Sequence, residues 1–410
     1  MIKNINKVCI LINWVREFDM YKNFLKGFDV NLIDFIINDI KTSEKERHKI
    51  STDILKVLKK NKVNYNFFYK IYKKKKYNLI ISTGQACSLN ITIYSIFRFV
   101  YAKIFGRFLI ITRIDKVFTR LFKRPFVADG KNCLIGEIWY PEKNLSDTVI
   151  KFPSGADLKL NNYPSNNIKK NFDIYFTNSA YEKKFLLKST YNKTVLNIGY
   201  PRYFELPNKS LLKRKILKEF SIINKKKIIY WTPTHIHIEK EKFSNFFPWI
   251  DKISPLNREY NIIVRPHPKA LRINPDIASL LISKGFIVDL KEDRSIGTLF
   301  KIADVILCDY GDSIFSAVYF TKPIILLNLN RDSEYLLMLE KSKSLDLKLR
   351  NSLLNFNIDV KLKIIKKKIS KSLSKNYISV VKNINKKHFG HLNNVEKKNS
   401  IHKLLMSYIN

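Results

Sequence analysis

Short runs of consecutive apolar residues, each followed by a longer amphipathic or polar stretch, recur along this chain of 410 residues. A run that is apolar at nearly every position is typical of a strand buried on both faces. Strands of that kind, separated by helices, form a parallel sheet with helices on both sides. We therefore predict an α/β protein. The clearest runs are Val8–Ile12, Val30–Ile37, Leu79–Ser82, Phe172–Phe176, Val195–Ile198, Lys227–Trp231, Tyr260–Val264, Asp304–Cys308 and Pro323–Leu327.

The length of the chain suits two α/β domains of about 200 residues each better than one core. The last apolar run of the first half ends at Gly199–Arg202, and we place the domain junction just after it. This gives an N-terminal domain over residues 1–207 and a C-terminal domain over residues 208–385. We expect surface helices without a strand over residues 345–377. A last helix within residues 386–410 is predicted to pack back across the domains.

Lysine and arginine together number 75 against 35 acidic residues, a formal net charge of +40. Such an excess suits an anionic membrane surface, nucleic acid or a phosphorylated substrate. The lysines are spread over the whole chain beside abundant asparagine and isoleucine, a mixture that an AT-rich genome also produces. No nucleic-acid-binding module is recognisable. We therefore expect no nucleic-acid partner and keep peripheral contact with an anionic membrane as a hypothesis.

Several features predict a protein of the cytoplasm. The four cysteines form no CxxC pair, which argues against a disulfide framework, and the first residues lack the pattern of a signal peptide. The segment Thr92–Thr112 is interrupted by Arg98, Lys103 and Arg107, so it does not suit a membrane span. Its apolar residues fall at helical spacing, which predicts an amphipathic helix. That helix either lies on the inner face of the cell membrane or packs against the core.

The segment Arg265-Pro266-His267-Pro268 directly follows a predicted strand. The two prolines fix φ at about −65° on either side of His267 and so make its backbone rigid. Arginine offers a permanent charge with several donors, and histidine offers a donor that also moves protons. A rigid Arg/His pair at a strand end favours a diphosphate site. A structural turn with an incidental histidine is the alternative.

A second polar segment, Asp309-Tyr310-Gly311-Asp312-Ser313, lies between a predicted strand and a predicted helix. The free N–H groups and the dipole at a helix N-terminus attract phosphate. Gly311 allows a ligand to approach closely, and Ser313 donates a hydroxyl. Asp312 repels phosphate unless it caps the helix, pairs with a cation or binds a ribose hydroxyl. Capping of the helix by Asp312 or Ser313 is the structural alternative.

A third segment, Thr232-Pro233-Thr234-His235-Ile236-His237, offers hydroxyls and two histidines two residues apart. A His-x-His pair is able to ligate a metal, but no companion cluster of histidine or acidic residues stands out nearby. We therefore predict neither a metal site nor a cofactor.

Together these segments resemble the CDP-glycerol glycerophosphotransferase family, which builds teichoic acids and related surface polymers. They occur in the family's order over residues 150 to 330. The resembling segments are Phe176–Ser179, Ile198–Arg202, Ile228–Thr234, Arg265–Pro268 and Ala303–Tyr310, with Ser313 and Phe315.

The resemblance implies a GT-B fold, in which two Rossmann-like domains have parallel sheets that face a central cleft. The nucleotide-diphosphate donor, CDP- or UDP-linked, then binds in the C-terminal domain, and a lipid-linked or glycan acceptor enters from the N-terminal side. His267 is implied as a catalytic residue at the donor diphosphate, with Arg265 holding the loop. The implied donor phosphate-binding residues are Arg265, Thr234, Gly311, Asp312 and Ser313.

One departure from the family concerns the acceptor side. The family has a Trp-His-Gly-type segment whose histidine resembles a general base, and its best counterpart here is Lys151–Lys159. Ser154, beside Gly155, stands in the histidine's place. Serine cannot serve as a base near neutral pH, so Asp157 is the nearest candidate for that role.

We therefore expect a transferase of surface-polymer synthesis that moves a polyol-phosphate from a CDP-linked donor to an acceptor hydroxyl. A glycosyltransferase that uses a nucleotide sugar is the close alternative. A UDP-sugar 2-epimerase is a further enzyme class, but it needs facing carboxylates and no clear pair is visible. Ser154 also motivates a catalytically degenerate GT-B protein that only binds nucleotide.

Overall fold

The computed structural model describes most of the two halves of the chain. The predicted amphipathic segment Thr92–Thr112 lies outside the described residues. The described residues are 8–25, 29, 32–38, 45–71, 77–84, 87–89, 137–139, 142–153, 171–190, 193–204, 206–233, 246–267, 270–271, 274–291, 294–328, 334–341, 344–390 and 394–409.

The first half forms a sheet of seven parallel strands, which we call the first sheet. Its central strands are buried at every position, as continuous apolar runs require. A separate antiparallel pair joins β5 (Cys87–Leu89) to β6 (Glu137–Trp139). In spatial order the strands of the first sheet are β3 (Tyr65–Phe67), β2 (Ile33–Ile37), β1 (Val8–Ile12), β4 (Leu79–Ser82), β7 (Val149–Lys151), β8 (Ile174–Thr177) and β9 (Thr194–Asn197).

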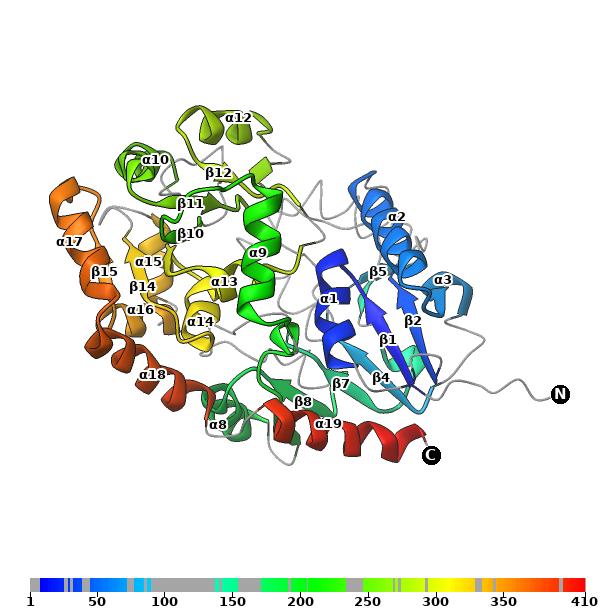
Figure 1. The fold of residues 1–410 in the computed structure, drawn as a ribbon. Helices are drawn as coiled ribbons and strands as arrows, with labels where there is room; N and C mark the ends of the chain where they lie inside the picture. The colour runs from blue at the N-terminus through cyan, green and yellow to red at the C-terminus, as the bar shows by residue number, and fades with distance from the viewer. Residues whose placement is uncertain are drawn as a thin grey trace, which may run out of the picture.

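Helices cover both faces of the first sheet, and each face has its own apolar core. One core includes residues of α1 (Val15–Phe24), α2 (Lys45–Lys60) and the C-terminal helix α19 (Asn394–Ile409). The other core includes residues of α3 (Phe68–Ile71), α6 (Glu142–Leu145) and α8 (Ala180–Ser189). Figure 1 shows α19 lying along the first sheet, far in sequence from the strands that it covers.

The second half forms a sheet of six parallel strands, the second sheet. In spatial order its strands are β12 (Ile287–Val288), β11 (Asn261–Val264), β10 (Ile228–Thr232), β13 (Val305–Cys308), β14 (Ile324–Leu327) and β15 (Leu354–Phe356). Its helices are α9 (Lys209–Glu219), α10 (Phe246–Ile253), α12 (Asp276–Ser283), α13 (Ile296–Ile302), α14 (Asp312–Tyr319), α15 (Glu334–Lys341), α16 (Leu345–Arg350), α17 (Leu362–Ser372) and α18 (Lys375–Phe389), with short 3₁₀ turns η3 (Pro201–Tyr203) before α9 and η5 (Ser254–Arg258) after α10.

The expectation of a strand-free segment over residues 345–377 is wrong, because β15 lies within it and pairs with β14. The strand has three residues, and Asn355 interrupts its apolar pattern. An edge strand this short leaves too weak a periodic signal among the surrounding lysines to be read from the sequence.

Each sheet has a switch point, where the chain leaves its first strand on one side and later returns to the other side. In the first sheet, β1 lies between β2 and β4, and in the second sheet β10 lies between β11 and β13. Ligands of open α/β sheets bind outside the carboxyl ends of the strands at such a point. The architecture therefore offers two candidate sites, one per sheet.

Two features of the described residues join the two halves. Asp19 on α1 lies within electrostatic range of Arg265 in the second half, and burial raises the pKa of its carboxyl while the charges of Arg202 and Arg265 oppose that rise. The helix α18 bridges the sheets, since the ring of His388 stacks on Tyr181 of α8 with a centroid distance of 5.8 Å. Figure 1 shows α18 running from the second sheet to α8.

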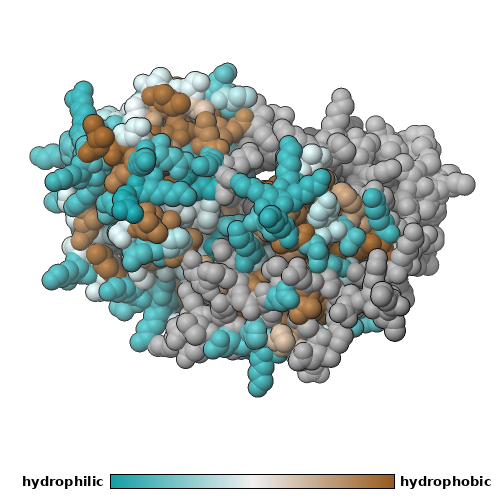
Figure 2. Space-filling model, turned by 45° about the vertical axis from the view of Figure 1, so that its right-hand side comes forward, coloured by the Kyte–Doolittle hydropathy of each residue, from teal (hydrophilic) through white to brown (hydrophobic). Residues whose placement is uncertain are grey.

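The described surface is mainly hydrophilic on the face that Figure 2 presents, with hydrophobic side chains in smaller groups. Within the described part of the chain, no helix has both the length and the apolar character needed to cross a membrane. The two parallel sheets with helices on both faces confirm the predicted α/β fold.

Candidate active site

The second sheet brings the three polar segments predicted from the sequence to adjacent strand ends. The order β11-β10-β13 places the residues after Val264, Thr232 and Cys308 next to one another. The register fixes this, because Trp231 pairs with Val264 and Thr232 pairs with Cys308. All three segments leave the same carboxyl edge of the sheet, at its switch point. We call this the second-sheet edge.

Arg265 holds a neighbouring loop in place. Its Nη1 donates to the carbonyl of Arg294 at 2.8 Å and its Nη2 to the carbonyl of Lys291 at 3.1 Å. The guanidinium also lies 3.5 Å from a carboxylate oxygen of the buried Asp289. Only 14% of the side chain is exposed. These contacts match the loop-holding role that the family resemblance implies for Arg265.

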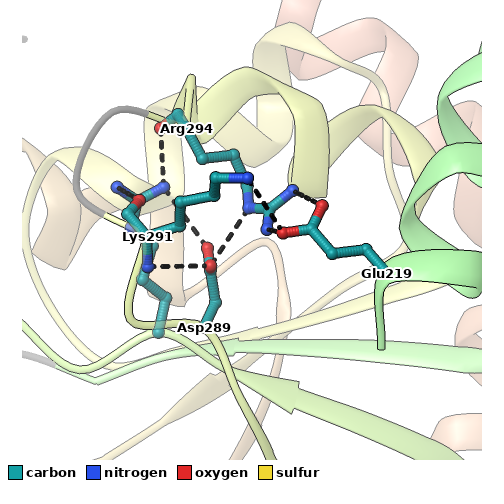
Figure 3. A network of polar contacts seen from close by, with 5 residues as sticks. Glu219, Asp289, Lys291 and Arg294 are labelled. Carbon is teal, nitrogen blue, oxygen red and sulfur yellow. Dashed lines mark hydrogen bonds and ion pairs between the residues drawn. The ribbon is translucent and has the colours of Figure 1, made fainter. Parts of the chain in front are cut away.

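The loop that Arg265 holds is itself anchored by a network of charges (Figure 3). The guanidinium of Arg294 binds both carboxylate oxygens of Glu219, at 3.0 and 2.5 Å, and donates from Nε to Asp289 at 3.0 Å. Hydrogen bonds from Arg294 are the main reason that the pKa of the Glu219 carboxyl is lowered. Lys291 adds a third cation, with its Nζ 3.3 Å from Glu219. The network ties α9 to the loop after β12.

His267 lies half-buried directly after the buried Pro266. Its carbonyl accepts hydrogen bonds from the N–H groups of Ala270 and Leu271, at 2.8 and 3.3 Å. The backbone at His267 is therefore fixed from the strand before it and from the turn after it. This is the rigid placement that the flanking prolines predict.

Gly311 is the N-cap residue of α14, with φ of 98°, a conformation that favours glycine. Its N–H donates to a carboxylate oxygen of Asp346 at 3.0 Å. A Cβ built at Gly311 would meet nothing within 4 Å, so the space beside it is open. The cap position belongs to Gly311, and neither Asp312 nor Ser313 caps the helix.

Asp312 and Ser313 are the first two residues of α14. The carboxylate of Asp312 accepts a hydrogen bond of 2.8 Å from the hydroxyl of Tyr200, a residue of the segment that joins the two sheets. Burial raises the pKa of the Cys308 thiol, and a side-chain hydrogen bond with Ser313 acts in the opposite direction. The Asp312 carboxylate thus has a protein partner at this helix N-terminus.

Residues of helix α16 hold the segment between β13 and α14 at the second-sheet edge. The sequence analysis did not predict this support. Arg350 donates to the carbonyl of Asp309, and its guanidinium lies 3.5 Å from the ring centroid of Tyr310. Asp346, which holds Gly311, also accepts from Ser344 at 2.5 Å. Both residues lie in the lysine-rich region after residue 337, where no local pattern separates them from surface charges.

One buried hydroxyl at the second-sheet edge has no partner among the described residues. The Oγ1 atom of Thr232, the last residue of β10, is buried without a hydrogen bond. The predicted site residues Thr234, Ser154, Gly155 and Asp157 lie outside the described residues. In the described ranges, no group of three or more His, Cys, Asp or Glu side chains is placed to hold a metal ion.

The first sheet carries a second group of buried polar residues at its own switch point, which sequence reasoning also missed. They come from four segments that are far apart in the chain, so no local motif marks them. We call them the first-edge cluster. Its members are Asn13, Glu17, Tyr21, Ser82, Thr83, Glu142 and Lys151.

Residues 155–335 match the sequence model of a family described as CDP-Glycerol:Poly(glycerophosphate) glycerophosphotransferase. The matched range contains His267 and the start of α14, and the match confirms the resemblance read from the sequence motifs. No curated protein sequence matches the chain significantly.

Among solved structures, the chain resembles the wall teichoic acid polymerase TagF. A variant of TagF matches with a TM-score of 0.60 and 14% identity, over 99% of this chain and 90% of that chain. The same variant soaked with CDPG matches with a TM-score of 0.58, 13% identity and the same coverage. At such identities the likeness shows the fold alone. Anabaena Alr3699/HepE in complex with UDP and glucose has a TM-score of 0.47 and 10% identity over 98% of this chain and 99% of that chain, which is too remote to carry an argument.

The family match supports a transferase of teichoic-acid-like polymer synthesis, and CDP-glycerol fits the family as donor.

Proposed function

We propose that this protein transfers a polyol-phosphate from CDP-glycerol to the hydroxyl of a growing surface polymer. The premise is the match of residues 155–335 to the glycerophosphotransferase family. The observation that carries this proposal is the adjacency of three polar strand ends at the switch point of the second sheet. The donor diphosphate would lie there, between His267 and the N-terminus of α14.

The groups at the second-sheet edge have separate tasks in this proposal. His267 donates to the diphosphate and stabilises the charge that grows on the leaving phosphate. The first-turn N–H groups of α14 and the hydroxyl of Ser313 bind the other phosphate oxygens. Arg265 acts as a positioning residue, because its guanidinium is committed to the loop carbonyls of Lys291 and Arg294.

Phosphoryl transfer needs little covalent participation by the protein, so positioning and electrostatics supply most of the rate. In the proposed step the acceptor oxygen attacks the phosphorus that bears the glycerol. The bond from that phosphorus to the bridging oxygen breaks, and cytidine monophosphate leaves with the electron pair. Thr232, Thr234 and Gly311 line the same edge in this proposal, with Asp312 held by Tyr200.

We propose a lipid-linked acceptor that is reached from the first sheet, and peripheral contact with the inner membrane face through the basic surface. The net charge of +40 supports attraction to anionic lipid. We also retain residues 1–207 and 208–385 as the proposed domains, with Ser154, Gly155 and Asp157 on the acceptor side.

The test is a transfer assay with CDP-glycerol and a polymer primer. The variant His267→Ala should lose roughly 100-fold or more in kcat while it remains folded, because one charge-stabilising donor typically contributes that much. His402→Ala, an exposed histidine on α19, is the matched control and should keep full activity.

Calorimetry with CDP and UDP adds a separate readout of the donor. Preferential binding of CDP supports the proposal. Binding of UDP alone would instead favour a glycosyltransferase, and full activity of His267→Ala would remove the central role of that residue.

A further inference from the structure

The first-edge cluster lies where an acceptor would meet the donor. Asn13 follows β1 and Thr83 follows β4, the two strands that flank the switch point of the first sheet. Glu17 and Tyr21 reach the same place from α1, on one face of the sheet, and Glu142 reaches it from α6, on the other. Asp19, on the same helix as Tyr21, lies within electrostatic range of Arg265 in the second half of the molecule.

The two carboxylates of the cluster differ in how fully they are bonded. Glu17 accepts from the N–H of Asn13 at 2.7 Å through Oε2, and from the hydroxyl of Thr83 at 2.7 Å through Oε1. Both of its oxygens are therefore engaged by the protein. Glu142 accepts from the hydroxyl of Ser82 at 2.5 Å through Oε1, and a backbone hydrogen bond at Glu142 itself also acts on its carboxyl.

Two buried oxygens in the cluster have no hydrogen-bond partner among the described residues. They are Oε2 of Glu142 and the hydroxyl of Tyr21. An unpaired buried polar atom is costly, and two in one cluster indicate a polar group that the described residues do not supply. Each lies within electrostatic range of the other, because the charge of Glu142 acts on the hydroxyl of Tyr21.

An aliphatic hydroxyl satisfies both of these atoms. It donates its proton to the carboxylate of Glu142, and its oxygen accepts from the hydroxyl of Tyr21. A phosphate or a carboxylate would fit poorly, because it would meet the charges of Glu142 and Glu17. The chemistry of the site therefore selects a neutral hydroxyl compound, such as the terminal polyol of a polymer.

We propose that the first-edge cluster binds the attacking hydroxyl of a polyol acceptor, and that Glu142 takes its proton. This inference rests on the proposed function and supplies the base that Ser154, in the place of the family's histidine, leaves open. As the acceptor oxygen bonds to the donor phosphorus, its proton moves to Oε2 of Glu142. Cytidine monophosphate leaves with the electrons of the broken phosphorus–oxygen bond.

The surroundings of Glu142 suit this role. Burial raises the pKa of its carboxyl to about 7, with the charge of Glu17 acting in the same direction. The hydrogen bond from Ser82 and the charge of Lys151 limit that rise. Lys151 is held by the carbonyls of Thr83 and Phe152. A base with a pKa near the working pH combines a large ionised fraction with a strong pull on the proton.

The test is the pH profile of kcat for polyol-phosphate transfer in the full-length protein. In the wild type, activity should rise with pH through about 7. Glu142→Gln should lose this rise and at least 100-fold of the rate, with binding of CDP unchanged by calorimetry. Glu182→Gln is the matched control, since Glu182 is a buried glutamate that accepts from the N–H of Asn178 at a neighbouring strand end. It should keep the wild-type profile.

Two milder variants guard against a folding defect in Glu142→Gln. Ser82→Ala removes a hydrogen bond that lowers the pKa of Glu142, so the rise in activity should move to higher pH. Tyr21→Phe should raise KM for the acceptor and leave the affinity for CDP unchanged.

An unshifted profile in Ser82→Ala, or a Glu142→Gln rate within threefold of wild type, overturns the assignment of Glu142 alone. A wild type that neither binds CDP nor transfers from CDP-glycerol overturns the proposed function as well.

Discussion

At the scale of single residues, some polar groups at the second-sheet edge hold loops in place, and others are assigned to the donor. Arg265, the most obvious phosphate ligand in the sequence, holds the loop after β12 through two carbonyls and Asp289. Gly311 likewise gives its N–H to Asp346. His267 and the first turn of α14 then remain as the groups assigned to the donor. A motif predicts where such residues lie, but their contacts decide the role of each.

The raised pKa of Glu142 carries a cost in stability that is measurable. Its carboxyl is protonated more readily in the folded state, at about 7, than in the unfolded chain. Folding stability therefore falls as the pH rises from about 4.5 to about 7, by roughly 3 kcal/mol at most. We expect Glu142→Gln to be more stable than the wild type at pH 8 and similar to it at pH 5, in urea unfolding followed by circular dichroism.

Glu182→Gln gives the contrast for that measurement. Its carboxylate accepts from the N–H of Asn178, so the substitution should destabilise the protein at both pH values. If Glu142→Gln is destabilised at pH 8 as much as Glu182→Gln, ionisation of the Glu142 carboxyl does not carry the cost in folding stability that we assign to it.

At the scale of secondary-structure elements, α16 and α18 organise the site from outside it. Asp346 and Arg350 of α16 hold the loop between β13 and α14. His388 lies near the end of α18. Its ring packs on Phe315 of α14, with the ring centroids 4.8 Å apart, and stacks on Tyr181 of α8. The position of the donor helix α14 thus depends on two elements that contribute no group to the proposed reaction.

Asp346→Asn tests the support that α16 gives. An amide keeps the shape but weakens the acceptor for the N–H of Gly311, so the loop should lose order. We expect a threefold to tenfold weaker affinity for CDP, measured by calorimetry, with a melting temperature lowered by only a few degrees. An unchanged affinity for CDP would show that α16 is merely structural.

His388 should make the bridge formed by α18 sensitive to acid. Burial lowers the pKa of its imidazole to about 4, below the ordinary value of 6.5. Between pH 6.5 and pH 4 the imidazole binds a proton more readily in the unfolded chain than in the folded protein. The free energy of unfolding is therefore highest above pH 6.5 and falls by roughly 3 kcal/mol as the pH is lowered toward 4. His388→Phe should flatten this part of the stability profile, whereas His402→Phe, on an exposed position, should not. Equal slopes in both variants would contradict the account.

Much of the fold follows from the sequence, because strands buried on both faces consist of consecutive apolar residues. The adjacency of the Arg265–His267 and Asp309–Ser313 segments also follows, once parallel strands are assumed. Three features do not follow. The strand β15 is too short, α16 looks like lysine-rich surface, and the first-edge cluster joins side chains from segments up to 138 residues apart, from Asn13 to Lys151. Such contacts are set by tertiary packing, which no local pattern records.

At the scale of the whole molecule, the two switch points offer one proposed site for each substrate. The hydrogen bond from Tyr200 to Asp312 and the electrostatic interaction of Asp19 with Arg265 join the first half to the carboxyl edge of the second sheet. A donor bound at one edge and a hydroxyl bound at the other would then meet between the halves. This division is the structural basis for proposing separate donor and acceptor binding.

The basic surface belongs to this scale as well. We expect the protein to float with anionic liposomes at about 0.05 M salt and to be released at about 0.5 M, because screening shortens the reach of its charges. Neutral liposomes should not carry it. A protein that stays unbound to anionic liposomes at low salt would contradict the proposed peripheral contact.

The most direct test of the central claim is a crystal structure of the protein with CDP-glycerol. The account predicts that the diphosphate lies at the second-sheet edge, with its oxygens about 3 Å from the side chain of His267 and from the donors at the start of α14. Density for the diphosphate at any other place, with His267 and Ser313 out of its reach, would contradict it.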